Sequence, residues 1–380
     1  MRLAIITTHP IQYYAPVFRL LAQKLDLKVF YTLGENSMNK HDPGFDKFIE
    51  WDIDLLNGYK YQWVNNVAAN PGSHHFSGIN NPDLIAQLTN WQPNAILVYG
   101  WAYKSHLSIM RHFKKKIPIF FRGDSTLLDH ISWPKKIARK IILKWVYSYI
   151  DHAFYVGTNN KAYFKNFGLK ESQLTFAPHA IDNKRFAANR TNEIKLLKQK
   201  LGINDNDLLL LFAGKFEAKK DPLLLLKAFL QIQQPNTHLL FVGNGEMEKQ
   251  LKADAFGNAN IHFMDFINQS DMPVIYQAAD LFCLTSKGPG ESWGLAVNEA
   301  MACSKAILVS DKVGCAIDLV THHYNGMVIK SGNIHELTIA LRELTTSKKK
   351  LAVYGKNSAT IIKNWNFETA TCAIENKINT

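Results

Sequence analysis

The chain has four cysteines among its 380 residues, and none of them stands in a Cys-x-x-Cys pair or at a metal-ligand spacing. A disulfide framework and a zinc site are therefore excluded as organising features. No stretch approaches the roughly 20 apolar residues that a membrane-spanning helix needs. The opening residues MRLAIITTHP hold only a short apolar run before Pro10. We therefore expect a first buried strand rather than a signal peptide, and a cytoplasmic protein with reduced thiols.

Internal repeats and low-complexity tracts are also lacking, and 47% of the residues are hydrophobic. The length and composition predict two domains of ordinary size with sizeable cores. Short apolar runs alternate with amphipathic segments of helical length, which is typical of doubly wound α/β domains. Residues 34–80 are rich in Asn, Gly and His and are predicted to be mostly loop. The predicted strands are 2–8, 27–32, 95–100, 117–123, 152–157, 207–215, 238–245, 279–286 and 306–311, and the predicted helices include 15–25, 106–116 and 221–232.

The net charge of +12 is concentrated in residues 104–144. Residues 133–150, WPKKIARKIILKWVYSYI, predict an amphipathic helix with lysines and arginine flanking an apolar stripe. Such a helix either lies on an anionic membrane or packs its stripe on the protein's own core. Nucleic acid is a third and weaker interpretation, because no nucleic-acid-binding module accompanies the charge, and we expect none as a partner. The stripe comprises Ile137, Ile141, Ile142, Trp145 and Tyr149, and the flanking cations are Lys135, Lys136, Arg139, Lys140 and Lys144.

The most informative stretch is GPGESWGLAVNEAMAC, residues 288–303. A predicted strand, a glycine-rich loop, Glu291, a helix that begins near Gly294, and Glu299 follow one another in that order. The first turn of the helix presents unpaired N–H groups and a positive dipole end, which favours a phosphate. Carboxylates on either side of a phosphate site suit a sugar nucleotide, because that ligand carries hydroxyls on both sides of a diphosphate.

Residues 208–330, including AADLFCLTS and KAILVSDKVGCAIDLV, resemble glycosyltransferase family 4, the "glycosyl transferases group 1" domain, in order and spacing. The pair Glu291 and Glu299 resembles the E-x7-E motif of its retaining members. The resemblance implies an α/β GT-B fold, in which two Rossmann-like doubly wound domains face a central cleft. It implies an acceptor domain at 1–183, a donor domain at 184–363, and a terminal helix at 364–380 that crosses back to the first domain. The linker at 176–189 departs from the family pattern, with His179 and Ala180 in place of Asn and Gly.

The resemblance assigns roles on the donor side. Lys215 and Lys220 match the two cations that hold the diphosphate, with Lys215 in place of an arginine. Glu291 is expected to bind hydroxyls of the donor sugar, and Glu299 the ribose. Gly243 and Gly245 permit close approach of the backbone to the nucleotide. The ring of Trp293 either shapes the sugar pocket or packs in the interior. Further donor-binding positions are Ser292, Gly294, Leu295, Phe266 and Ile267, the last two for the base.

On the acceptor side the match is weaker. His9, Gln12 and Tyr13 follow the first predicted strand, where doubly wound sheets bind ligands. Arg122 and Asp124 occupy the place where the family often has a histidine that touches the donor sugar. Asp124 is either a catalytic-site acceptor or a turn residue that caps the next helix. His106 is expected in the core or on the surface rather than in the site.

Neither metal nor cofactor is expected. The Asp-x-Asp pairs at Asp52 and Asp54 and at Asp205 and Asp207 are weak signals. The predicted activity is therefore a metal-independent, retaining hexosyl transfer (EC 2.4) from a UDP- or GDP-sugar to a saccharide or lipid-linked acceptor. Cell-envelope polysaccharide or glycolipid synthesis, on the inner face of the cytoplasmic membrane, is the expected setting. The rival hypotheses are a GT-B sugar-nucleotide epimerase and a non-catalytic basic scaffold that binds anionic lipid.

Overall fold

The protein is described by a computed structural model that covers residues 1–38, 41–42, 47–48 and 50–380. Contacts divide the chain into two compact units. Unit 1 contains residues 1–40, 53–179 and 367–380, and unit 2 contains residues 41–52 and 180–366. Neither unit is one continuous stretch of chain.

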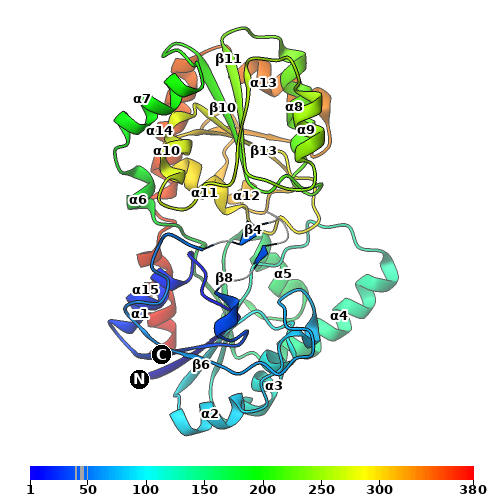
Figure 1. Cartoon of the computed structure of the whole chain (residues 1–380). Helices are drawn as coiled ribbons and strands as arrows, with labels where there is room; N and C mark the ends of the chain where they lie inside the picture. The colour runs from blue at the N-terminus through cyan, green and yellow to red at the C-terminus, as the bar shows by residue number, and fades with distance from the viewer. Residues whose placement is uncertain (39–40, 43–46, 49) are drawn as a thin grey trace. The chain divides into compact units, whose positions relative to one another are not determined.

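Unit 1 is built on a seven-stranded parallel sheet with the order β5-β2-β1-β6-β7-β8-β9 (Figure 1). Its central strands are buried along nearly their whole length, as expected for a parallel sheet that helices cover on both faces. In the register of the sheet, Ile5 of β1 lies between Val29 and Leu97. The strands are β1 (Arg2–Thr7), β2 (Asp26–Tyr31), β5 (Lys60–Trp63), β6 (Ala95–Tyr99), β7 (Ile119–Arg122), β8 (His152–Tyr155) and β9 (Leu174–Phe176).

Two helical layers cover this sheet. One face packs into a single apolar core with α2 (Leu84–Trp91), α3 (Lys104–Phe113), α4 (Trp133–Tyr147) and α5 (Thr158–Asn166). The other face carries α1 (Ala15–Ala22) and α15 (Phe367–Ile378), which pack against each other. Lys24 and Glu375 form an ion pair at 2.6 Å between these two segments. Short 3-10 turns complete the unit: η1 (Glu35–Ser37), η2 (Phe76–Gly78) and η3 (Glu171–Gln173).

Unit 2 repeats the design with a six-stranded parallel sheet of order β12-β11-β10-β13-β14-β15. In both sheets the chain therefore reverses its direction of travel across the sheet once, between β1 and β6 and between β10 and β13. The strands are β10 (Leu208–Ala213), β11 (Thr237–Val242), β12 (Ile261–Met264), β13 (Leu281–Leu284), β14 (Ala306–Ser310) and β15 (Gly326–Ile329), with a separate antiparallel pair β3 (His41–Asp42) and β4 (Lys47–Phe48).

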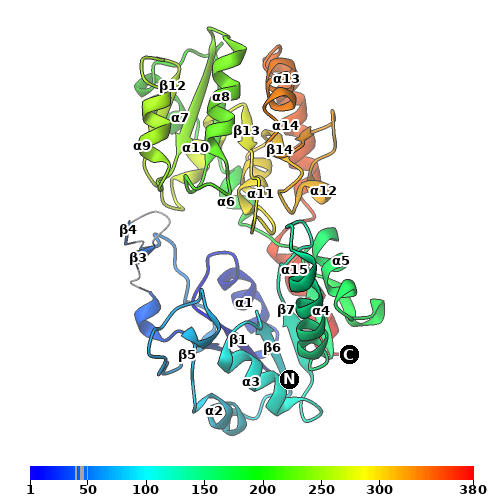
Figure 2. The same cartoon turned by 90° about the vertical axis from the view of Figure 1, so that its right-hand side faces the viewer.

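Helices again form two layers, one on each face of the sheet (Figures 1 and 2). The first layer is α8 (Pro222–Ile232), α9 (Glu248–Asp254) and α13 (Ile334–Leu344). The second is α7 (Thr191–Lys200), α10 (Met272–Ala278), α11 (Leu295–Ala302) and α14 (Lys348–Ile362). The short helices α6 (Asn183–Ala187) and α12 (Ala316–Leu319) lie at its edge, against α11 and α14 respectively.

The predicted α/β fold with two Rossmann-like domains is confirmed, and the predicted strands are present to within three residues at each end. Residues 34–80 are mostly irregular, as expected, but they also contain β5, which the sequence analysis missed. Its residues, KYQW, are only half-buried or exposed, because β5 is the edge strand of its sheet. An edge strand lacks the apolar run by which the central strands are recognised.

His106 lies in the core rather than in a site. Its side chain on α3 is fully buried, with Nδ1 2.8 Å from the Gly100 carbonyl and Nε2 2.9 Å from Thr32 Oγ1. Since a carbonyl only accepts, Nδ1 carries the proton. Burial lowers the pKa of His106 to about 4. The neutral ring thus ties the ends of β2 and β6 together.

This pKa shift predicts acid sensitivity. Between pH 6.5 and 4 the unfolded chain binds a proton that folded His106 refuses, so stability is lost as the pH falls through that window. The loss from this residue is at most about 1.4 kcal/mol per pH unit. Thermal unfolding of the wild type and of His106→Gln at pH 7 and pH 5 measures it. We expect the wild type to lose more stability on acidification than the variant; equal losses would contradict the assignment.

Candidate functional site

The carboxyl ends of β10 and β13 define the candidate site in unit 2. Doubly wound sheets bind ligands outside the carboxyl ends of their strands, at the point where the strand order reverses. The loop after β10 carries Lys215 and Lys220, and the loop after β13 carries Ser286 and Glu291. Parallel strands direct both loops to the same edge of the sheet.

Lys220 and Glu291 form an ion pair there. The Lys220 Nζ to Glu291 Oε2 distance is 3.0 Å, and the two side chains are only 16% and 10% exposed. The Ser286 hydroxyl donates to the same carboxylate oxygen at 3.1 Å. One ammonium from the loop after β10, and one hydroxyl and one carboxylate from the loop after β13, thus converge on a single point. Lys215, half-buried, stands five residues before Lys220 on the same loop.

Backbone contacts hold the loops that carry this pair. The Thr285 hydroxyl contacts the carbonyls of Lys220 and Asp221 at 3.2 and 2.9 Å. The Gly314 N–H donates to the Glu291 carbonyl at 3.1 Å. A Cβ on Gly314 would lie 1.7 Å from the Ser292 carbonyl oxygen, so only glycine allows this approach. The loop after β14 therefore supports the loop that bears Glu291.

Helix α11 begins at this edge, as predicted, with Gly294 as its N-cap at φ 95°. Glycine has no side chain to cap the first turn, so the N-terminus of the helix is open to an anion, while the Val297 N–H donates to the Gly294 carbonyl at 2.9 Å. Ser292 and Leu295, half-buried, lie on either side of the cap. Glu299 lies inside the helix, 4% exposed, and accepts a hydrogen bond from the Tyr276 hydroxyl at 2.8 Å.

Trp293 packs in the interior. It is 4% exposed, its indole N–H donates to Asn298 Oδ1 at 2.9 Å, and its ring lies 5.1 Å from that of Trp365. Of the two interpretations left open by the sequence, the structure shows packing. The side chain anchors the start of α11 to the segment that follows α14.

The loop after β11 stands next to that of β10. Gly243 has φ 137°, and a Cβ there would lie 2.1 Å from the Gly214 carbonyl oxygen. The close approach that requires this glycine is therefore to the neighbouring loop, whereas the sequence analysis expected it toward the nucleotide. Asn244, which was not singled out, accepts the Phe266 N–H at 2.9 Å and donates to Asp265 at 3.1 Å. It thereby fixes the predicted base-binding position beside β11.

Residues 50–52 pack on the same part of unit 2. The ring of Trp51 lies 6.3 Å from that of Phe266, edge to face, and Asn268 donates to the Glu50 carbonyl at 2.7 Å. Asp52 accepts the Ser270 N–H at 3.0 Å. The sequence pattern gave no signal for this contact, because it joins residues about 215 positions apart. Ile267, like Phe266, is half-buried here.

The two Asp-x-Asp pairs have structural roles. Asp52 binds Ser270, and Asp54 accepts the N–H groups of Leu56 and Asn57 at 3.0 and 3.1 Å. Asp207 accepts the Asn204 N–H at 2.8 Å. Within the part of the chain that the structure describes, no cluster of three or more His, Cys, Asp or Glu residues is arranged to hold a metal ion.

Unit 1 gathers its predicted residues at the carboxyl edge of its own sheet. His9, Gln12 and Tyr13 are half-buried on the loop between β1 and α1, and Thr8 Oγ1 lies 2.9 Å from His9 Nδ1. Asp124 follows β7, and its side chain is 44% exposed. His9, Gln12 and Tyr13 therefore lie beyond β1, at the reversal point of the sheet of unit 1, where a ligand is expected, and Asp124 lies beyond β7 at the same edge.

Arg122 and His179 lie beneath that surface. Arg122 is 5% exposed and donates to the carbonyls of Ala177 and Pro178 at 2.8 and 2.9 Å, so it holds the end of the unit rather than lining its surface. Buried His179 has Nε2 3.8 Å from Asp124 Oδ2, and its ring is parallel to that of Tyr14. Burial lowers the pKa of His179. The neutral imidazole of His179 is thus a neighbour of Asp124. The sequence analysis identified His179 only as a departure from the family pattern and did not predict this contact.

Helix α4 exposes the stripe predicted at 133–150. Trp133 is 74% exposed and Ile141 66%, and Ile137, Ile142 and Trp145 are exposed as well. The residues of α4 that reach the core are Leu143, Val146 and Tyr147. Four of the five predicted stripe residues are therefore exposed rather than packed on the protein's own core, whereas half-buried Tyr149 packs against it. In the described ranges, no helix has both the length and the apolar character needed to cross a bilayer.

Comparison with known proteins identifies the class of the site-bearing domain. Residues 193–360 match the model of the family described as Glycosyl transferases group 1. This segment contains Lys215, Lys220, Glu291 and Glu299. The domain that carries the ion pair thus matches the model of a glycosyltransferase family.

Particular relatives agree with this class. An uncharacterized glycosyltransferase of Methanocaldococcus jannaschii is 24% identical over 295 residues, 74% of this chain and 72% of that protein. The N,N'-diacetylbacillosaminyl-diphospho-undecaprenol alpha-1,3-N-acetylgalactosaminyltransferase of Campylobacter jejuni is 26% identical over 58% of this chain and 57% of its own. The chain spans about half to three quarters of the length of the curated relatives it matches.

Solved structures establish the fold. Anabaena HepE in complex with UDP and glucose superposes with a TM-score of 0.72 at 17% identity, with 100% of both chains covered. The fold of this chain is that of GT-B glycosyltransferases, as the sequence analysis predicted.

The glycine contacts predict a stability difference between two Gly→Ala substitutions. Gly243→Ala places a Cβ against the Gly214 carbonyl, whereas Gly202, also at positive φ, has nothing within 4 Å of the added atom. Both variants incur the strain of a left-handed residue, roughly 1–2 kcal/mol, but only Gly243→Ala adds a backbone clash. We expect the unfolding midpoint of Gly243→Ala to fall clearly below that of Gly202→Ala. Equal unfolding midpoints for the two variants would show that the loops after β10 and β11 can move apart to accommodate the added Cβ without loss of stability.

Proposed function

We propose that the protein is a retaining glycosyltransferase of the family 4 type, which transfers a sugar from a nucleoside diphosphate donor to a saccharide or lipid-linked acceptor. The observation that carries the proposal is the half-buried Lys220–Glu291 pair, joined by Ser286, beside the N-terminus of α11. Cations and backbone N–H groups suit a diphosphate, and a carboxylate suits sugar hydroxyls.

In the proposed donor complex, the diphosphate lies between the Lys215 and Lys220 side chains and the first turn of α11. Glu291 accepts hydroxyls of the transferred sugar, and Glu299 accepts from the ribose. The leaving diphosphate gains negative charge as the bond from C1 to its oxygen breaks. Fixed cations aimed at that oxygen stabilise the transition state more than the ground state.

Retention follows if the acceptor attacks C1 from the face that the diphosphate leaves. The acceptor oxygen forms its bond to C1, the C1–phosphate oxygen bond breaks, and the acceptor proton passes to the departing phosphate oxygen. This sequence needs no carboxylate nucleophile and no metal ion, since Lys215, Lys220 and the helix N-terminus supply the positive charge. Asp124 in unit 1 is proposed to accept a hydrogen bond from a substrate hydroxyl, with His9, Gln12 and Tyr13 beside it.

A uridine diphosphate sugar is the proposed donor. Solved structures with the same fold were obtained with UDP and with a UDP-sugar analogue: Anabaena HepE with UDP and glucose, and an E. coli protein with UDP-2-fluoro glucose. In the proposed complex the base lies against Phe266 and Ile267, which Asn244 and Trp51 hold in place. A GDP-sugar is the alternative donor.

Adjacent lysines provide a matched test of the site. Lys220 pairs with Glu291, whereas Lys219 pairs with Glu217 at 3.1 Å on the same loop. We expect Lys220→Met and Glu291→Gln each to lower kcat by about 100- to 1000-fold, the loss typical of a removed transition-state contact. Lys219→Met should change kcat by less than about 10-fold. Release of UDP from a panel of UDP- and GDP-sugars, with the fold checked by thermal unfolding, is the measurement.

The same assay separates the rival hypotheses. An epimerase would interconvert two sugar nucleotides without release of the nucleoside diphosphate. A scaffold would show no turnover with any donor, and its lipid binding would survive Glu291→Gln. Adding EDTA should leave transferase turnover unchanged; a loss that Mg²⁺ or Mn²⁺ restores would reject the metal-independent mechanism.

We also infer that α4 binds an anionic membrane. Its exposed stripe has Trp133 and Ile141 as its most prominent side chains, and five cations lie on the same helix. Apolar side chains that enter the lipid interface and lysines that meet anionic headgroups act together in such helices. Figure 1 shows α4 standing out from the rest of unit 1. An acceptor that is itself a lipid would be met at this surface.

Vesicle binding tests the inference. Trp133→Ser/Ile141→Ser removes two exposed apolar side chains from α4, and Phe256→Ser/Val353→Ser removes two from unit 2 as a control. We expect the first variant to bind vesicles of 30% anionic lipid about 10-fold more weakly or worse, since burying one such side chain gains roughly 1.5–3 kcal/mol. The control should bind like the wild type. Equal binding of both variants would contradict a role for α4.

A further inference from the structure

A cavity of about 330 Å³ lies between α4 and the loop at 126–131, entirely within unit 1. Its lining contains three basic side chains, Lys136, Arg139 and Lys140, and one carboxylate, Asp129. Apolar side chains complete the wall: Leu127, Leu128, Ile131 and Phe167. The cavity therefore combines a net positive lining with an apolar wall. It is separate from the residues assigned to the donor site, all of which are in unit 2.

The cations stand where a helix normally places its core residues. Each lies seven positions, or about two turns, before a residue that reaches the core, so both sets share one face of α4. The second half of this face is apolar and buried, whereas the first half is cationic and lines the cavity. On the opposite face the apolar stripe is exposed. The first half of α4 thus inverts the usual pattern: half-buried Arg139 faces the cavity with Lys136 and Lys140 at its exposed rim, and apolar side chains are exposed on the opposite face. The buried residues are Leu143, Val146 and Tyr147.

This arrangement costs free energy unless the cations at the cavity bind an anion and the exposed stripe contacts an apolar phase. The half-buried guanidinium of Arg139 loses part of its hydration, and exposed indole and aliphatic groups order water. An anion in the cavity compensates the first cost, and an apolar phase against the stripe removes the second. Both partners are present at once in a phosphorylated lipid at a membrane surface.

Arg139 is held in position before any ligand arrives. Its guanidinium donates to the Tyr163 hydroxyl at 2.9 Å and lies over the rings of Tyr163 and Phe167, at 5.4 and 6.0 Å from their centres. The residue is half-buried, while Lys136 and Lys140 are exposed at the rim. A fixed, planar guanidinium recognises phosphate oxygens with a small loss of side-chain entropy.

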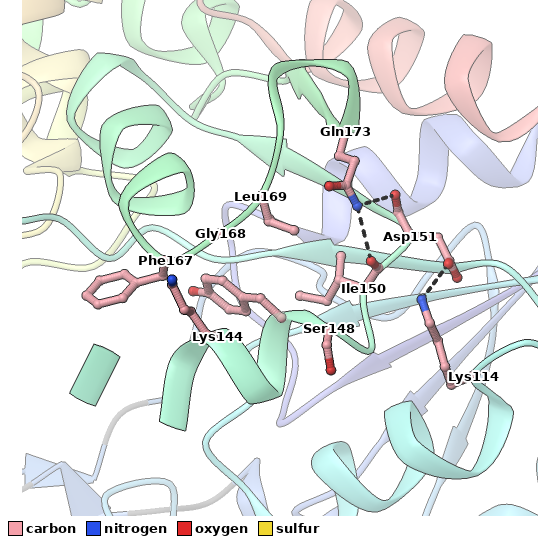
Figure 3. A pocket seen from close by; sticks show the side chains of 10 residues that line it. Lys114, Lys144, Ser148, Ile150, Asp151, Phe167, Gly168, Leu169 and Gln173 are labelled. Atoms are coloured by element: carbon pink, nitrogen blue, oxygen red, sulfur yellow. Dashed lines mark hydrogen bonds and ion pairs between the residues drawn. The ribbon is translucent and has the colours of Figure 1, made fainter. Parts of the chain in front are cut away.

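The neighbouring cavity lacks this combination. It has a volume of about 430 Å³, shares Phe167 with the first, and is drawn in Figure 3. Its Lys114 is neutralised by Asp151 at 2.6 Å, and the Gln173 amide donates to the Asp151 carbonyl at 3.2 Å (Figure 3). Of its two lysines, Lys114 is thus paired with a carboxylate, and the lining has no arginine.

We propose that the cavity between α4 and residues 126–131 binds the phosphate of a lipid phosphate, with the first carbons of its chain against Leu127, Leu128 and Ile131. The identification of that lipid as the glycosyl acceptor rests on the proposed function; the phosphate site itself does not. The inference assigns the acceptor to the lipid-linked class rather than to free saccharides.

Two double variants of α4 separate a defined site from a diffuse charge effect. Lys136→Gln/Lys140→Gln removes two charges that line the cavity, and Lys135→Gln/Lys144→Gln removes two from the same helix that do not. The probes are octyl phosphate, 1-octanol and inorganic phosphate, each titrated calorimetrically below the concentration at which it aggregates. The full chain is used, and thermal unfolding confirms that both variants fold.

We expect octyl phosphate to bind the wild type at least about 10-fold more tightly than octanol or inorganic phosphate, because only it engages both the cations and the apolar wall. Lys136→Gln/Lys140→Gln should weaken that binding about 10-fold or more, and Lys135→Gln/Lys144→Gln less than about twofold.

Three results overturn the inference. If both double variants lose the same affinity for octyl phosphate, the cations act only as a diffuse positive field. If the wild type binds octanol as tightly as octyl phosphate, the cavity is merely apolar. If it binds inorganic phosphate as tightly, the cavity is a site for free phosphate. UDP binding to the wild type, followed by thermal shift, reports on the proposed donor site alone. If the wild type binds UDP but not octyl phosphate, this inference is rejected and the proposed function is retained. If it binds octyl phosphate but not UDP, the proposed donor site is rejected.

Discussion

The ion pair between Lys220 and Glu291 is the constraint on which the candidate site depends. A half-buried carboxylate and a half-buried ammonium each lose hydration, and they are tolerated together because they lie 3.0 Å apart with Ser286 on the same oxygen. The pair therefore couples the loop after β10 to the loop before α11. Around it, the Thr285 hydroxyl and the close contact of Gly314 leave these loops little freedom. A charged ligand entering this edge meets groups that are already in place.

Much of the fold and the position of the candidate site could be predicted from the sequence, for a physical reason. Buried parallel strands are short apolar runs, and loops at their carboxyl ends carry the polar residues, so spacing along the chain translates directly into position. Glu291 and the helix start near Gly294 were predicted from this order of strand, loop and helix, and Lys220 from the resemblance to the family. Edge strand β5 was missed because it lacks an apolar run. Asn244, Tyr276 and Trp51 were missed because their roles are contacts with distant segments, for which local pattern carries no signal.

Helix α4 shows where periodicity reaches its limit. An apolar stripe flanked by lysines fits a core-packed helix and a lipid-bound helix equally well. What decides between them is which face meets the body of the protein, and that depends on where the loop at 126–131 and α5 lie. The structure places Arg139 half-buried at the cavity with Lys136 and Lys140 at its exposed rim, and leaves most of the stripe exposed. The neighbours of α4, and not its sequence pattern, therefore decide between the two interpretations.

The interleaving of the two units along the chain governs how the protein is made. Residues 41–52 belong by their contacts to unit 2, although the chain on both sides of them belongs to unit 1. Helix α15 belongs to unit 1, although the chain before it belongs to unit 2. Cutting the gene between codons 179 and 180 would deprive unit 1 of the helix that covers α1 and deprive unit 2 of the tryptophan beside Phe266. During synthesis, the face of the unit 1 sheet that carries α1 therefore stays only partly covered until α15 has left the ribosome.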